Sequence, residues 1–130
     1  MAAYGFERTI DGLDFDAAVD RITATLKDEG FGVLTEIDVK TTLKKKLDVN
    51  FRRYKILGAC NPPIAHQALE AEPQIGLLLP CNVVVQDADG GGVSISAIDP
   101  RAMFQVVGRD DLENLVADVE ARLRRALEAV

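Results

Sequence analysis

The sequence predicts an α+β fold in which two longer helices cover a mostly antiparallel sheet. Three observations support this class. Several short segments alternate between apolar and polar residues, which is typical of half-buried strands. Two longer segments, 15–29 and 112–127, carry apolar residues at helical spacing. Residues 87–92 are rich in aspartate and glycine and separate two alternating segments, which predicts an antiparallel hairpin.

The N-terminal part of the chain predicts one strand followed by the first longer helix. Residues 4–9 alternate between aromatic and small or polar side chains, as a strand does. Asp14 is a suitable N-cap, because its carboxylate can accept hydrogen bonds from the first N–H groups of a helix. Gly30 favours a left-handed end to that helix. The apolar residues between them predict its buried face: Phe15, Ala18, Val19, Ile22 and Leu26.

The next part predicts two strands on either side of a short basic helix. Residues 31–37 alternate and end at Asp38, which can cap a helix over 39–47. The apolar residues of this helix are four apart, so its lysines face outward. A further strand over 53–59 then places Cys60 at a strand end.

A second helix and a hairpin are predicted after Cys60. Asn61 is a suitable N-cap and Pro62 suits the first helical position. After a break at 72–76, we expect a strand whose apolar segments, 77–79 and 81–86, are interrupted at Pro80. We place Pro80 at an edge or a bulge, because proline cannot donate to a ladder of hydrogen bonds. The returning strand covers 93–97.

The C-terminal part predicts a turn or short helix at 101–104 and then the second longer helix. Asp110 and Glu113 have the spacing of a capping box at the start of that helix. Its acidic start and basic end complement the helix dipole. Its apolar face is formed by Leu112, Leu115, Val116, Val119, Leu123 and Leu127.

Length and composition predict one globular domain over 1–130. The chain has 48% hydrophobic and 28% charged residues, and a chain of 130 residues needs one core. No apolar run approaches the roughly 20 residues of a membrane-spanning helix, and the N-terminus lacks a signal-like segment. We therefore expect a cytoplasmic protein with no membrane partner. The net charge of −6 argues against a nucleic-acid partner.

Four segments resemble the family called domain of unknown function 302. They are GFGVLTEID at 30–38, LGACNP at 57–62, LPCNVVV at 79–85 and IDP at 98–100. The resemblance implies a fold similar to the TATA-binding protein, with the order β-α-β(4)-α, to which this chain adds short helices. It also implies a homodimer. It implies no established reaction and no catalytic residues.

The two cysteines are the candidates for catalysis. Cys60 precedes a predicted helix start, where the helix dipole and nearby cations can activate a thiol. Pro62 and Pro63 weaken that case, because they remove two N–H donors that would stabilise a thiolate. Cys81 could act as its redox partner if the two α-carbons lie within roughly 7 Å. The alternative is that both are buried small apolar residues.

No metal site is expected. The set that could be considered is Cys60, His66, Cys81 and one carboxylate, and its spacing is not that of a zinc site. The sequence leaves the cofactor unassigned.

Residues 40–55, which we call the basic segment, contain seven basic residues and one acidic residue. The segment carries about +6 and the remainder of the chain about −12. Such asymmetry is compatible with binding a small anionic ligand or with a contact between subunits. The alternative is a solvated helix face.

Both Cys-Asn pairs and several acidic residues fall at predicted strand ends. We hypothesise that they converge in one site of a dimeric module that binds a small ligand. Two alternatives are a thiol-based redox enzyme or sensor that uses Cys60 with Cys81, and a protein-interaction module that uses the basic segment. Glu36 and Asp38 could also act as an acid and base pair, or serve as a strand residue and a cap. The candidate ligand-binding residues are Glu36, Asp38, Asn61, Pro80, Asn82 and Asp99.

Overall fold

The computed structural model describes residues 3–130. Met1 and Ala2, at the start of the expected 1–130 domain, lie outside the described residues. The elements in chain order are β1 (Gly5–Ile10), α1 (Phe15–Asp28), β2 (Gly32–Asp38), α2 (Val39–Leu47), β3 (Tyr54–Cys60), α3 (Pro62–Ala71), η1 (Pro73–Leu78), β4 (Cys81–Asp87), β5 (Val93–Ile98), α4 (Pro100–Gln105), η2 (Asp110–Leu112) and α5 (Glu113–Glu128), where η marks a 3₁₀ helix.

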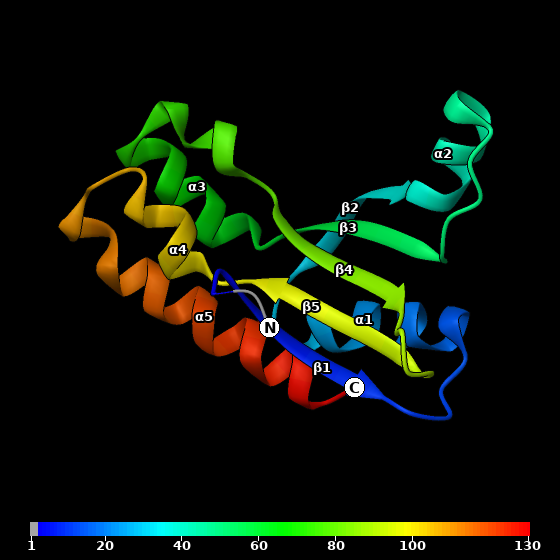
Figure 1. Cartoon of the computed structure of the whole chain (residues 1–130). Coiled ribbons are helices and arrows are strands. Elements are labelled where there is room, and N and C mark those ends of the chain that lie inside the picture. Colours follow the sequence, from blue (N-terminus) through cyan, green and yellow to red (C-terminus); the bar gives the residue numbers. More distant parts are fainter. Residues whose placement is uncertain (1–2) are drawn as a thin grey trace.

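The five strands found in residues 3–130 form one sheet in the order β1-β5-β4-β3-β2. Each strand is antiparallel to its neighbours. This confirms the α+β class, and the order of strands and longer helices is the expected β-α-β(4)-α with α2, α3 and α4 as short additions. Figure 1 shows α2 apart from the rest of the chain, beyond the end of β2 and the start of β3.

One face of the sheet forms the core with α1 and α5. Leu57, Val83 and Ile95 point to this face from three neighbouring strands and are fully buried. Ile22 of α1 and Leu123 of α5 meet them. Side chains alternate along a strand, so the intervening residues lie on the opposite face. That open face carries polar side chains that are mostly exposed or half-buried, including Glu7, Thr9, Asn82, Gln86 and Ser96.

The predicted helix caps are confirmed at three positions. Asp14 accepts hydrogen bonds from the N–H groups of the first turn of α1 at 3.1 and 3.3 Å. Asp38 accepts one from the N–H of Thr41 at 3.0 Å, and Asn61 caps α3. Gly30 follows α1 with φ of 87°, the left-handed conformation that glycine adopts without strain.

Two local predictions were wrong. The Asp110–Glu113 capping box does not form, because the Glu113 carboxylate accepts from Arg101 and α5 begins after η2 without a side-chain cap. Residues 77–79 do not form a strand. Pro73 and the Glu72 carboxylate, which accepts from the N–H of Gln74, start η1 there instead.

Arg8 joins the first strand to the end of the last helix. Its Nη1 donates to the carbonyl oxygens of Leu127, Glu128 and Val130 at 3.2, 2.7 and 2.9 Å. The last carbonyls of a helix have no partner within the helix and carry a partial negative charge. A guanidinium therefore stabilises this terminus and holds it against β1.

Candidate functional site

The two cysteines lie at the same end of neighbouring strands. Ala59 is opposite Cys81 in the register of β3 and β4, so Cys60 is one residue beyond the pair. Neither cysteine is in a disulfide in the part of the chain that the structure describes. Both line a cavity of about 30 Å³. Such a volume holds about one or two water molecules, which is too little for a substrate. The other lining residues are almost all apolar: Phe31, Ala59, Asn61, Ile64, Ala65, Ala68, Leu79, Pro80, Met103, Phe104 and Val119.

The Cys81 thiol is not activated. Burial raises its pKa to about 11, and the neighbouring Cys60 adds to the rise. Desolvation disfavours the charged thiolate, and no cation offsets it. The thiol is therefore protonated at neutral pH and behaves as a small apolar side chain of the core.

Asn61 joins three helices at one buried point. Its Oδ1 accepts from the N–H of Ile64 at 3.4 Å, and its Nδ2 donates to the carbonyl of Glu29 at 3.5 Å. Arg122 of α5 donates to the same carbonyl at 2.9 Å. The polar groups of the Asn61 side chain are thus engaged within the fold. A Cβ added at Gly30 would lie 2.9 Å from the Asn61 Nδ2. Asn61 is 8% exposed, and its side chain serves as a helix cap.

We expect Asn61→Ala to lower the free energy of unfolding by about 1–2 kcal/mol, because it removes a cap and leaves buried groups without a partner. Urea denaturation measures the loss. Asn82→Ala is the matched control, since Asn82 is exposed and follows the other cysteine. Equal stabilities of the two variants would contradict this role for Asn61.

Glu36 and Asp38 belong to β2 and lie beside the start of β3, at the opposite end of that strand from Cys60. Gly32 pairs with Cys60, whereas Asp38 pairs with Lys55, because the two strands run antiparallel. The Lys55 Nζ is 2.7 Å from the Glu36 carboxylate. The hydrogen bond from the backbone of Thr41 lowers the pKa of Asp38. The expected convergence therefore does not include Glu36 and Asp38, which serve as an ion-pair partner and a helix cap.

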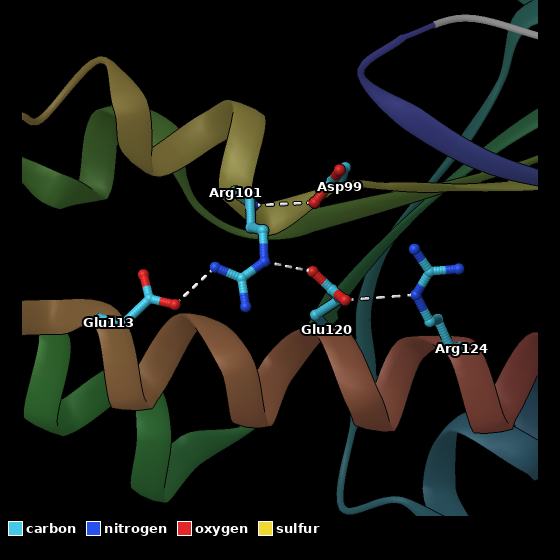
Figure 2. A network of polar contacts seen from close by, with 5 residues as sticks. All are labelled: Asp99, Arg101, Glu113, Glu120 and Arg124. Atoms are coloured by element: carbon cyan, nitrogen blue, oxygen red, sulfur yellow. Dashed lines mark hydrogen bonds and ion pairs between the residues drawn. The ribbon is translucent and has the colours of Figure 1, made fainter.

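Asp99 lies at the cysteine end of the sheet but is engaged as a cap. It follows β5 and accepts from the N–H of Arg101 at 2.9 Å, which starts α4. Figure 2 shows the Arg101 guanidinium lying between Glu113 and Glu120 of α5. Glu120 also accepts from Arg124 at 3.3 Å. This network fixes α4 on α5, with Met103 and Phe104 of α4 closing the small cavity.

A further hollow near the predicted residues lies on the open face of the sheet. It has a volume of about 330 Å³, and we call it the basin. Its centre is a row of opposed residues on three strands, Glu7, Ser96 and Val84. Asn82, Ile98 and Gly5 form the floor nearer the cysteine end. Of the predicted site residues, Asn82 alone lines it; the other lining residues are Tyr4, Phe6, Tyr54, Gln86 and Ala97.

Three polar side chains of the basin lack partners among the residues that the structure describes. Within residues 3–130, the side chains of Glu7, Asn82 and Gln86 form neither hydrogen bonds nor ion pairs with other residues. Beside Gln86 in the register, the buried Ser94 hydroxyl also lacks a hydrogen-bond partner in this range. Buried polar groups normally have one. A neighbouring hollow of about 270 Å³ shares Asn82 and Ile98 and extends to Pro80.

The chain is similar to known proteins in both sequence and fold. A model of a domain of unknown function, DUF302, matches residues 6–130. The chain belongs to the DUF302 family. The crystal structure of uncharacterized conserved protein DUF302 from Bacillus stearothermophilus is similar to this DUF302 chain over 98% of each, with 29% sequence identity and a TM-score of 0.90. The family resemblance is thus confirmed. None of the curated proteins matches the chain.

Residues 3–130 contain no cluster of three or more His, Cys, Asp or Glu side chains that could hold a metal ion. No helix in the same range is both long and apolar enough to cross a bilayer.

The basic segment forms a separate surface of the DUF302 fold. None of the nine residues of α2 is buried, and the segment joins the sheet through β3. Large apolar side chains on and beside it are exposed rather than packed: Leu34, Ile37, Leu47, Val49 and Phe51. Exposed apolar side chains of this size are available for contact with a partner.

Proposed function

We propose that this DUF302 domain is a non-catalytic module that binds a small ligand in the basin. The observation that carries the proposal is a hollow of about 330 Å³ in which Glu7, Asn82 and Gln86 have no partner within residues 3–130. This volume lies in the range of small-molecule sites, roughly 300–1,000 Å³. Polar groups that are not used by the fold are available to orient a ligand.

The thiol-redox alternative has less support. The cavity between Cys60 and Cys81 is small and apolar, and the raised pKa of Cys81 disfavours a thiolate there. A resolving cysteine needs access to its partner and to a reductant. The cytoplasmic location stays a prediction.

Binding in the basin is tested by titrating isotope-labelled protein with small compounds that contain one aromatic ring. The NMR chemical shifts of the backbone amides are followed. We expect the shifts to centre on Asn82 and Ser96. Ser96→Leu should abolish them, because leucine fills the centre of the basin. Thr9→Leu is the matched control on the same face outside the basin. Shifts centred elsewhere, or unchanged in the Ser96→Leu variant, would contradict the proposal.

We further propose that two copies of the chain associate through the basic segment. Its charge of about +6 complements the acidic remainder, and the exposed Leu47 and Phe51 supply apolar area. The protein-interaction alternative would use the same segment. An anionic ligand would compete for the same lysines.

Leu47→Asp should convert a dimer to a monomer of 14.1 kDa in light scattering after size exclusion. Changing Lys44, Lys45 and Lys46 to Glu should weaken association in a salt-dependent way. Leu77→Asp is the control, because Leu77 is 83% exposed on η1, far along the chain from the segment. A wild-type monomer, or equal effects of Leu47→Asp and Leu77→Asp, would contradict the interface.

A further inference from the structure

We infer that the basin selects a small organic cation, such as a protonated amine. The inference rests on the proposed function and names the class of ligand. Its basis is the charge of the residues that line the basin. Glu7 is the only charged residue among the described residues that line the basin, and its side chain is exposed to solvent. Its carboxylate has no ion-pair partner within residues 3–130.

Neighbouring basic residues do not neutralise Glu7. Arg8 is adjacent in sequence, but its side chain lies on the opposite face of β1 and donates to the carbonyls that end α5. Arg53 pairs with Asp87 at 3.0 Å, and Lys55 pairs with Glu36. Each cation of the nearby strands is therefore committed to another acceptor. An anionic ligand would lose its hydration and meet a carboxylate without a compensating cation.

The remaining lining groups suit an amine. Tyr54 pairs with Gln86 at one end of the basin, and Tyr4 precedes Gly5 at the other. The face of a tyrosine ring attracts a cation. The side-chain oxygen of Asn82 or that of Gln86 can accept a hydrogen bond from an ammonium group. Val84 and Ile98 offer an apolar floor to the carbon part of the ligand.

Three probes of the same shape test the inference: benzylamine, benzyl alcohol and benzoate, which are cationic, neutral and anionic at pH 7. Each is titrated against the labelled full chain while the amides of Asn82 and Ser96 are followed. We expect benzylamine to bind at least about tenfold more tightly than benzyl alcohol, since tenfold corresponds to about 1.4 kcal/mol. Benzoate should bind more weakly than either. Benzylamine binding should also weaken with added salt.

The decisive variant is Glu7→Gln, which removes the charge and keeps the shape. It should weaken benzylamine binding about tenfold and leave benzyl alcohol unchanged. Asp20→Asn is the control, because Asp20 is exposed on α1 and is not among the basin's lining residues. Equal binding of amine and alcohol, or an unaffected Glu7→Gln variant, overturns the cation selectivity while the binding site stands. Absence of basin shifts with all three probes overturns both this inference and the proposed function.

Discussion

Replacing Gly58 by alanine is expected to lower the free energy of unfolding by about 3 kcal/mol, the cost of overpacking a rigid site. A Cβ at this position would lie 2.2 Å from Thr35 Oγ1 and 2.7 Å from Pro80 Cγ. Thr35 approaches so closely because the register of β2 and β3 shifts between Val33 and Thr35. The proline ring cannot rotate away, so the sheet itself must move.

Urea denaturation followed by circular dichroism measures this loss. Gly32→Ala is the matched control, because Gly32 also lies in a strand, β2, and a Cβ there would meet nothing within 4 Å. We expect the Gly32 variant to be as stable as the wild type or slightly more so, since alanine restricts the unfolded chain. Similar stabilities of the two variants would show that the contact at Gly58 relaxes without cost.

The second large effect is a loss of stability at alkaline pH that originates at Cys81. Its folded pKa is about 11, against 9.0 for an ordinary thiol. Below pH 9 the thiol is protonated in both states and the stability is fully present. As the pH rises from 9 through 11, the unfolded state loses its proton first, so the unfolded state is favoured. Each pKa unit corresponds to about 1.4 kcal/mol, which gives a loss of about 3 kcal/mol.

The measurement is the free energy of unfolding from pH 8 to 11.5 for the wild type and for Cys81→Ala. Tyrosine and lysine titrate in the same range in both proteins, so the difference between the two curves isolates the thiol. We expect the variant to lose less stability than the wild type over this interval. Cys60→Ala, which removes the half-buried cysteine, is the control and should retain most of the loss. Parallel curves for wild type and Cys81→Ala would contradict the burial effect.

The features that the sequence predicted correctly depend on local chemistry. Asp14, Asp38 and Asn61 cap helices through their own first turns, which involve residues two or three positions away. The apolar spacing of α1 and α5 marks their buried faces in the same local way. The Glu113 cap failed because Arg101, twelve residues away, takes its carboxylate. A competing long-range partner leaves no trace in a local motif.

The candidate site was harder to predict because it depends on strand register. Alternation shows that Ser96 and Val84 face away from Ala97 and Val83, but it does not show that Glu7 lies beside Ser96. The two Cys-Asn pairs illustrate the difference. Asn61 follows the end of a strand and is drawn into a buried helix cap, whereas Asn82 lies inside β4 and faces the basin. The same dipeptide thus has two different environments.

The contact of Arg8 with the end of α5 has a consequence for the order of folding. β1 pairs with β5, whose residues lie 83–93 positions later, and Arg8 reaches carbonyls about 120 positions away. The loop-closure entropy of such distant contacts must be overcome before they stabilise the chain. The β4–β5 hairpin is local by comparison. We therefore expect the strand that is synthesised first to dock last, so that weakening its contacts accelerates unfolding and hardly changes the rate of folding.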